Sequence, residues 1–170
     1  MPILYTIGHS NHPADRFVDL LRLHGVTRLV DVRSHPYSRW APQYRRRQLA
    51  EALACADVDY VFLGDTLGGR PAAAEYHDTD GNVDYEARRQ AADFLAGIET
   101  LRRLATERRT VMMCAEEDPA RCHRRLLITP PLLVRDPLRQ RIEVAHIRGD
   151  GRLQPESGIR AGDGQLGLFS

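Results

Sequence analysis

Lysine is absent from this sequence, and all 24 basic residues among its 170 are arginine. The absence excludes chemistry that depends on a lysine amine, namely a Schiff base, a pyridoxal phosphate anchor, a P-loop lysine and a lysine-dependent DNA lyase. Every cation of the chain is therefore a planar, permanently charged guanidinium, a group suited to binding phosphate or carboxylate. A codon bias toward arginine is the simplest origin of this composition.

Long apolar runs and cysteine are also scarce. No stretch approaches the roughly 20 apolar residues of a membrane span, and the first residues lack the pattern of a signal peptide. The three cysteines are an odd set that does not suggest a disulfide framework. The 24 basic and 23 acidic residues give a net charge of +1, so only a local arginine cluster could attract nucleic acid. We therefore expect a cytoplasmic protein without a membrane partner.

Apolar segments with strand character alternate with segments of helical spacing. The predicted strands are residues 2–7, 27–32, 59–63, 110–113 and 143–147. Helical patterns occupy residues 13–25, 45–56, 84–107 and a segment from about 118 to the paired prolines at 130 and 131. This order predicts an α/β fold: a mostly parallel sheet of about five strands with helices on both faces, flavodoxin-like or like an incomplete barrel. We expect one domain over residues 1–148 and a flexible, glycine-rich tail over 149–170.

Clusters of polar residues follow each predicted strand. In chain order they read GHSNH, RSHPYS, GDTLGGRP, CAEEDP and RGDG. The carboxyl ends of parallel strands meet at one edge of a sheet, and ligands bind there. The sequence therefore predicts a ligand site at the C-terminal edge of the sheet.

Two carboxylates in these clusters are candidates for acid–base catalysis. Asp31 lies near the end of the second strand, next to Val32, and Glu116 follows the fourth. Asp31 and Arg33 lie two residues apart in a strand, so their side chains should point to the same side. They form either a structural ion pair, or a functional pair in which Arg33 clamps a phosphate or carboxylate while Asp31 acts as a base or orients it.

Two further clusters offer groups for binding an anion. His9 and Ser10 precede a helix start, where they could bind an anion, unless Ser10 merely caps the helix. His9 is also a candidate for proton transfer. Gly68 and Gly69 would let the backbone approach a ligand closely, with Arg70 beside them to bind phosphate.

The segment CAEEDPARCHRR is richest in reactive side chains. Cys114 ends the fourth strand as a candidate nucleophile, and Cys122, His123 and Arg124 fall in the first turns of the next helix. That helix N-terminus would lower the pKa of a thiol and attract phosphate, with His123 transferring protons and Arg124 binding the anion. The spacing from Cys114 to Arg121 is too long for the Cys-x5-Arg loop of a phosphatase. A zinc site of Cys114, Cys122, His123 and His9 is conceivable, but adjacent helical residues point about 100° apart, so joint ligation by Cys122 and His123 is strained. We therefore expect no metal, and we also expect no cofactor.

Aromatic and basic residues interleave in the segment PYSRWAPQYRRR. Tyr37 and Trp40 could stack on unpaired bases while neighbouring arginines hold the phosphates, as single-stranded nucleic acid requires. The alternative is a solvated basic helix face with the tryptophan covering the edge of the core. Nucleic-acid contact by this segment is therefore one of two open interpretations.

Four motifs together resemble the bacterial domain of unknown function 488 family: YTIGHSN, LVDVRSHPYSR, LGGRP and CAEEDPARCHR. The resemblance runs in this order from Tyr5 to about Gly151. The resemblance implies an α/β fold and the positions of the site residues, but the family name implies no established reaction. The sequence departs from the family at ITPPLLVRDPL, where paired prolines interrupt an expected helix.

The last six residues, QLGLFS, resemble the bacterial sliding-clamp-binding peptide. The resemblance implies that Gln165 hydrogen-bonds at the rim of the clamp's pocket while Leu166, Leu168 and Phe169 fill its apolar cleft. A glycine-rich tether before them would raise the concentration of the domain at DNA without tight intrinsic binding. The alternative is that the tail packs on its own domain.

These observations lead us to expect a DNA-associated enzyme of repair or base processing. It would hydrolyse a glycosidic or phosphate bond of a nucleotide, in single-stranded DNA or in a flipped base, while tethered to the sliding clamp. Two alternatives stay open. One is a small-molecule enzyme that acts on nucleotides with Cys114 as its nucleophile, and the other is a non-catalytic adaptor bound to the clamp.

Overall fold

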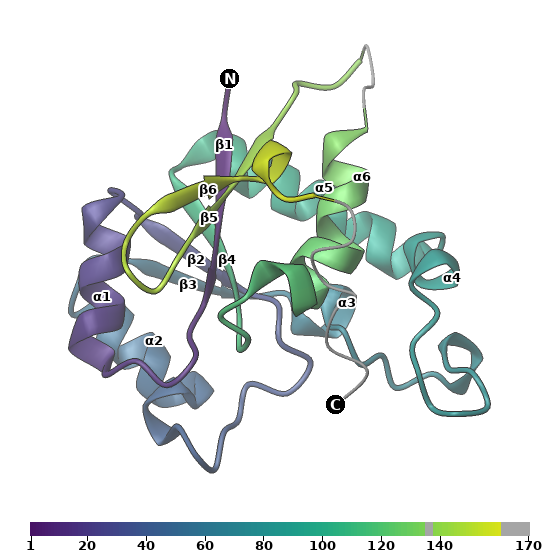
Figure 1. Ribbon diagram of the computed structural model, residues 1–170, viewed down its shortest axis with the longest axis horizontal. Coiled ribbons are helices and arrows are strands. Elements are labelled where there is room, and N and C mark those ends of the chain that lie inside the picture. The colour runs from purple at the N-terminus through teal and green to yellow at the C-terminus, as the bar shows by residue number, and fades with distance from the viewer. Residues whose placement is uncertain (135–137, 161–170) are drawn as a thin grey trace.

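A six-stranded sheet with helices on both faces forms the protein, shown as a computed structural model that describes residues 1–134 and 138–160 (Figure 1). The strands are β1 (Ile3–Gly8), β2 (Arg28–Asp31), β3 (Asp59–Phe62), β4 (Thr110–Cys114), β5 (Glu143–Ile147) and β6 (Leu153–Pro155). The α-helices are α1 (Ala14–Leu23), α2 (Arg46–Ala54), α3 (Gly64–Leu67), α4 (Tyr85–Arg89), α5 (Ala92–Glu107) and α6 (Thr129–Leu133). Short 3-10 helices span Pro42–Tyr44, Ala74–Tyr76, Pro119–Arg121 and Glu156–Gly158, and a π-helix spans Arg124–Ile128.

The strand order is β3-β2-β4-β1-β5-β6. All neighbouring strands run parallel except β5 and β6, which pair antiparallel. The predicted α/β class with a mostly parallel sheet is confirmed, with one strand more than expected. The order differs from that of flavodoxin-like sheets, in which the first and third strands are neighbours.

Alternation of side chains along the strands divides the core into two layers. In β4, Val111 and Met113 face the layer that contains helices α1 and α2. Met112 and Cys114 face the opposite layer, formed by α5, the π-helix and α6. Because both faces are covered, every residue of β2 and β4 is buried, as is usual for parallel strands.

The chain leaves β4 on a different face from its two neighbours in the sheet. Strands β1 and β2 lead into α1 and α2 in one layer, whereas β4 leads into the π-helix and α6 in the other (Figure 1). Such a reversal opens a crevice at the carboxyl ends of the strands. The fold therefore creates room for a ligand beside the end of β4.

The segment after β5 packs on the domain, although a flexible tail is predicted from residue 149 onward. Strand β6 pairs with β5, and the following 3-10 helix carries Glu156. The Glu156 carboxylate lies 2.7 Å from His146 Nε2 and 2.9 Å from Arg125 Nε. These contacts attach residues 149–160 to the sheet, so the folded part extends past the predicted boundary at Arg148.

Two predicted helices are divided in the structure. The predicted helix 84–107 is interrupted between α4 and α5, because Ala91 has an extended backbone (φ −68°, ψ 137°) and Asp84 caps a separate short helix. The helix after β4 contains a π-helical turn immediately before Pro130 and Pro131. Both prolines then fall in the first turn of α6, the part of a helix where proline is tolerated best.

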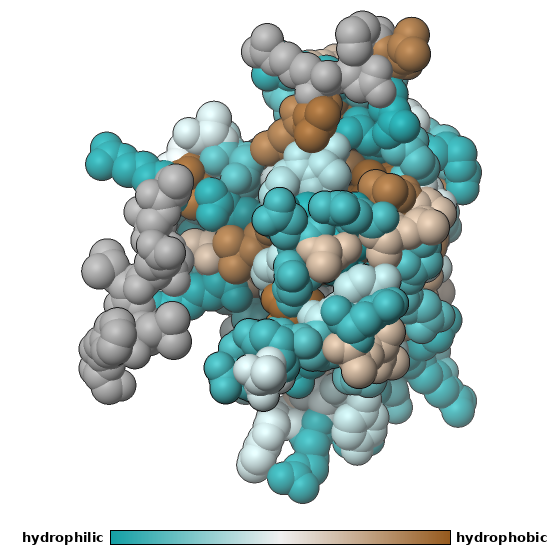
Figure 2. Space-filling view, turned by 90° about the vertical axis from the view of Figure 1, so that its right-hand side faces the viewer, coloured by the Kyte–Doolittle hydropathy of each residue, from teal (hydrophilic) through white to brown (hydrophobic). Residues whose placement is uncertain are grey.

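The face seen in Figure 2 is largely hydrophilic, with apolar surface beside the grey atoms at its top. Exposed Leu133, Val134 and Leu138 flank residues 135–137. Among the described residues no helix is both long and apolar enough to cross a membrane.

Candidate functional site

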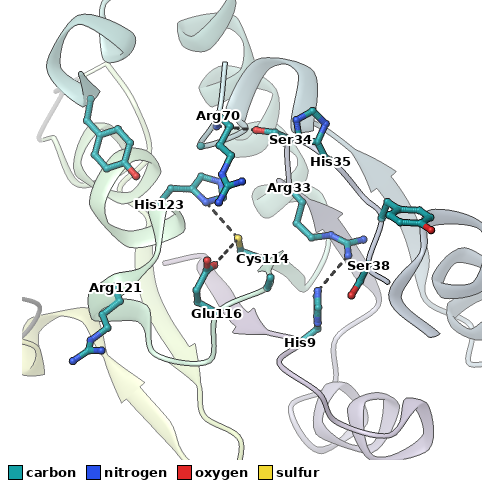
Figure 3. Close-up of a pocket in the computed structure, with 14 residues that line it drawn as sticks. His9, Arg33, Ser34, His35, Ser38, Arg70, Cys114, Glu116, Arg121 and His123 are labelled. Atoms are coloured by element: carbon teal, nitrogen blue, oxygen red, sulfur yellow. Dashed lines mark hydrogen bonds between the residues drawn. The ribbon is translucent and has the colours of Figure 1, made fainter. Parts of the chain in front are cut away.

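A polar cavity of about 410 Å³ lies at the carboxyl ends of β1, β2 and β4 (Figure 3). This volume lies within the range of small-molecule sites. Its lining comes mainly from the segments that follow the strands, as the polar clusters of the sequence predict. The lining residues are His9, Arg33, Ser34, His35, Tyr37, Ser38, Gly69, Arg70, Tyr85, Cys114, Ala115, Glu116, Arg121 and His123.

Cys114, Glu116 and His123 form a contact cluster on one wall of the cavity. The Cys114 Sγ atom lies 3.3 Å from Glu116 Oε2 and 3.3 Å from His123 Nδ1 (Figure 3). The other ring nitrogen of His123, Nε2, lies 3.0 Å from the Val32 carbonyl oxygen. Because a carbonyl only accepts hydrogen bonds, Nε2 donates to Val32, and Nδ1 is the ring nitrogen directed at the thiol.

Glycines bring this cluster together. A Cβ atom on Gly8 would lie 1.7 Å from the Glu116 carbonyl oxygen, so the end of β1 needs glycine for the loop after β4 to cross it. A Cβ atom on Gly69 would lie 2.7 Å from His123 Cγ. Gly69 therefore permits the close contact that holds the His123 ring in place.

Two adjacent glutamates have different surroundings. Glu117 pairs with Arg148 at 2.8 Å and accepts a hydrogen bond from the Gly149 amide, so it fixes the loop. Glu116 faces the cavity. Burial favours its neutral form, but its own backbone amide, the thiols of Cys114 and Cys122 and the nearby His123 outweigh this, so the pKa of Glu116 lies below its usual value. Glu116 is therefore ionised near neutral pH, the form in which a carboxylate can accept a proton.

Arg33 is held rigidly by Asp31 behind the cavity wall. Asp31 Oδ1 accepts from Arg33 Nε at 2.9 Å, and Asp31 Oδ2 accepts from Arg33 Nη2 at 2.8 Å and from the Tyr60 hydroxyl at 2.7 Å. Asp31 is fully buried and does not line the cavity. The structure thus favours the orienting role of Asp31, and the predicted role of general base does not fit its position.

His9 is the second side chain that hydrogen-bonds to Arg33, after Asp31. Its Nε2 accepts from Arg33 Nη1 at 3.2 Å, and its Nδ1 donates to the Ser10 carbonyl at 2.7 Å, while the ring stacks on Tyr44 with centroids 4.2 Å apart. Burial is the main cause that lowers the His9 pKa to about 4, and the Arg33 charge adds to it. Neutral His9 therefore positions Arg33, and its ring nitrogens are both occupied by protein partners.

The low pKa of His9 predicts a pH dependence of stability. The unfolded chain binds a proton on His9 near pH 6.5, whereas the folded protein binds it only near pH 4. This stabilisation is fully present above pH 6.5 and is lost as the pH falls toward 4, with a magnitude on the order of 3 kcal/mol. We expect His9→Gln to have a shallower slope of unfolding free energy against pH in this window, measured by urea denaturation. Equal slopes for both proteins would contradict the assignment.

The charges that line the cavity favour an anion. Three arginines and one glutamate contribute to the wall. Three N–H donors of Arg33 are engaged by Asp31 and His9, which leaves two for a ligand. In Figure 3 the Arg70 guanidinium points toward the Cys114 cluster, whereas Arg121 points away from it. Arg33 and Arg70 are therefore the groups best placed to bind phosphate or carboxylate.

Several predicted site residues lie outside the cavity wall. Arg124 is fully buried and donates to the Thr6 hydroxyl and to the backbone carbonyls of the loop after β4, so it has a structural role and does not bind phosphate. Ser10 is exposed with φ of 47°. Gly68 packs against Ser34 and does not line the cavity. Trp40 is 84 % exposed and does not line it either.

Cys122 is predicted to lie at a helix N-terminus that lowers the pKa of its thiol, and the structure shows a different backbone and a different pKa shift. It lies between a 3-10 helix and the π-helix with an extended backbone (φ −114°, ψ 142°). The hydrogen bond with Cys114 and burial both raise the pKa of the Cys122 thiol, opposite to the predicted lowering. The helix N-terminus therefore does not activate this cysteine.

Some lining residues were not singled out from the sequence. Ser34 belongs to the RSHPYS cluster, and its hydroxyl accepts a hydrogen bond from the Arg70 amide at 2.9 Å, which joins two walls of the cavity. His35 and Ser38 come from the same cluster, which is the only sequence signal for them. Tyr85 reaches the cavity from α4, and no local pattern identifies it because it belongs to a helical segment.

Comparisons with known proteins place the chain in a family. A family model described as "Domain of unknown function DUF488" matches residues 13–129. The chain belongs to this family. The DUF488 match includes β2, β3, β4 and most of the cavity wall, but not His9. Searches of curated proteins and of solved structures found no match. The predicted clamp-binding residues Gln165, Leu166, Leu168 and Phe169 lie outside the described residues.

Proposed function

We propose that this DUF488 protein is a hydrolase that acts on a nucleotide unit of DNA. The observation that carries the proposal is the Cys114–Glu116–His123 cluster, which shares one cavity with Arg33 and Arg70. Arg33 and Arg70 bind a phosphate of the substrate, and Glu116 removes a proton from the attacking water. Water adds to the carbon or phosphorus centre as the glycosidic or phosphate bond breaks, and the departing group leaves with the proton.

Exposed aromatic rings near the cavity favour single-stranded DNA or a flipped base as the substrate. Tyr37 lines the cavity and is 63 % exposed, and Trp40 lies three residues further along the chain. Each ring has a guanidinium close to its face, Arg45 at 4.6 Å from Tyr37 and Arg39 at 5.3 Å from Trp40. Rings that stack on bases, next to arginines that bind phosphate, are typical of surfaces for unpaired nucleic acid.

The partner and location belong to the proposal on sequence grounds alone. Gln165, Leu166, Leu168 and Phe169 would bind the sliding clamp and bring the cavity to DNA. A cytoplasmic location follows from that partner. Both statements are separate from the chemistry of the cavity.

A panel of substrates tests the proposed reaction. The full chain is incubated with single-stranded and duplex oligonucleotides carrying damaged bases, and with free nucleotides, and chromatography detects released base or phosphate. We expect turnover of at least one oligonucleotide, and Arg70→Gln should raise KM about 10- to 100-fold because it removes a charge-assisted hydrogen bond. Arg22→Gln, an exposed change on α1, serves as the matched control with unchanged kinetics. No product from any oligonucleotide or nucleotide, with the protein folded, would contradict the proposal and favour the adaptor.

A second candidate is a small-molecule enzyme with Cys114 as its nucleophile. It is favoured by the acceptor Nδ1 of His123 lying 3.3 Å from the thiol, an arrangement that can take the thiol proton. This function predicts rapid alkylation of Cys114 by iodoacetamide, with loss of activity, and slower alkylation in His123→Asn. A Cys114 nucleophile needs no contribution from Cys122, whereas a metal site formed by both cysteines would need it.

A further inference from the structure

Three potential metal ligands converge on one side of the cavity. The ligand atoms of Cys114, Cys122 and His123 all lie within 4.8 Å of one another, and Cys122 Sγ is 3.9 Å from His123 Nδ1. Zinc binds sulfur at about 2.3 Å and nitrogen at about 2.0–2.1 Å, so its tetrahedral ligand atoms lie about 3.5–4 Å apart. The three atoms are therefore close to the spacing that one zinc ion requires.

The local backbone allows the two adjacent residues to share an ion. Cys122 is extended, and His123 begins the helical turn with φ −60° and ψ −25°. The predicted strain assumed that both residues are helical, which would point their side chains about 100° apart. With this change of backbone both side chains turn toward Cys114, and the objection to joint ligation no longer applies.

The surroundings of His123 fit a metal ligand. Its Nε2 donates to the Val32 carbonyl, so Nδ1 is the nitrogen left for a metal, and it is directed at the two sulfurs. Metal-binding histidines are usually fixed in this way, by a hydrogen bond from the second ring nitrogen to a carbonyl or carboxylate. Gly69 packs against the ring and holds its orientation.

We propose that Cys114, Cys122 and His123 bind a zinc ion whose fourth position opens to the cavity beside Glu116. Each thiol releases its proton to solvent on binding, and the two thiolates balance the charge of the ion. The ion would supply a water of lowered pKa to the hydrolysis, and Glu116 would hydrogen-bond to that water. The role of the ion, though not its binding, rests on the proposed function. Zinc-dependent nucleobase deaminases use the same donor set, two cysteines and a histidine, with a glutamate that is not a ligand.

Metal content is the direct test. The full chain is stripped of metal under reducing conditions, loaded with Zn²⁺, desalted and measured by mass spectrometry of the metal. We expect about one ion per chain for the wild type, for Glu116→Gln and for the control Cys55→Ser, whose cysteine is exposed at the end of α2. Cys122→Ser should bind at least 100-fold more weakly. A wild type without zinc, or Cys122→Ser with undiminished affinity, would overturn the proposal.

Loading the wild type with Co²⁺ tests the site without a variant, in case Cys122→Ser fails to fold. Co²⁺ bound by two thiolates and an imidazole in the wild type should give intense sulfur-to-metal charge-transfer absorption and the visible bands of a tetrahedral ion. Absence of the charge-transfer absorption in the loaded wild type would overturn the zinc site without any variant.

Activity separates failure of the zinc site from failure of the proposed function. Zinc binding without turnover of any substrate would leave the metal site standing and reject the hydrolase. Turnover that persists after the metal is removed would reject the catalytic role of the ion and favour Cys114 as a nucleophile, while the metal content alone decides whether the site exists. Turnover lost on chelation and restored by Zn²⁺ supports both.

Discussion

Glu116→Gln is expected to lower kcat for the hydrolysis by about 100- to 10,000-fold, the usual contribution of a general base. Glu116 is the only carboxylate that lines the cavity in the described part of the chain, and its lowered pKa keeps it ionised at neutral pH. Glutamine has nearly the same shape but cannot take a proton from water. KM should change little because Arg33 and Arg70 are unaltered, and steady-state kinetics on the substrate from the panel measure both constants.

Glu117→Gln is the matched control for this prediction. Glu117 is adjacent to Glu116 and is the same residue type. Its carboxylate pairs with Arg148 and does not line the cavity. We expect kcat within about twofold of the wild type, with some loss of stability from the broken pair. Equal effects of the two substitutions, or a Glu116→Gln enzyme within tenfold of the wild type, would remove Glu116 from the mechanism.

Asp31→Asn is expected to destabilise the protein by about 3–5 kcal/mol, because it leaves the charge of Arg33 buried without its partner. The side chains of Asp31 and Arg33 are 0 % and 6 % exposed, and Asp31 also accepts from Tyr60. The loss is measured as the free energy of unfolding in urea at pH 7. Activity of the remaining folded protein should fall as well, since Arg33 would lose its orientation.

Asp59→Asn provides the comparison. Asp59 pairs with Arg108 at 2.7 Å, and both side chains are about half exposed. Asp59 also lies 3.9 Å from Arg28, but Arg28 has a closer partner in Glu107 at 3.0 Å, so the exchange should cost less than about 1 kcal/mol. A cost below 1 kcal/mol for Asp31→Asn would show that Asp31 does not hold Arg33 as described.

The strands of the sheet could be predicted closely from the sequence, and the segments between them less well. Buried parallel strands are short runs of apolar residues, a local signal that identified β1 to β5 within a residue or two. Strand β6 has no such run. Its pairing with β5 and the hydrogen bond between Glu156 and His146 are contacts that no local pattern in the sequence reveals. The spacing of apolar residues also does not reveal where helices are interrupted. The break between α4 and α5 comes from the extended backbone at Ala91, and the helix after β4 contains a π-helical turn.

The candidate site could be predicted in position but only partly in its roles. Polar residues after parallel strands identified His9, Arg33, Cys114 and Glu116, since topology brings these ends together. The same pattern could not tell which charged groups face inward. Asp31 follows the strand alternation into the layer of α1 and α2, and Arg124 is directed beneath the loop, so both stabilise the wall from behind.

The most direct test of the central claim is a crystal structure of Glu116→Gln with a bound single-stranded oligonucleotide from the substrate panel. The inactive variant should hold an uncleaved nucleotide in the cavity, with its phosphate on Arg33 and Arg70 and the bond to be broken facing residue 116. An oligonucleotide bound only along the surface near Trp40, with no nucleotide in the cavity, would contradict the assignment of this cavity as the catalytic site.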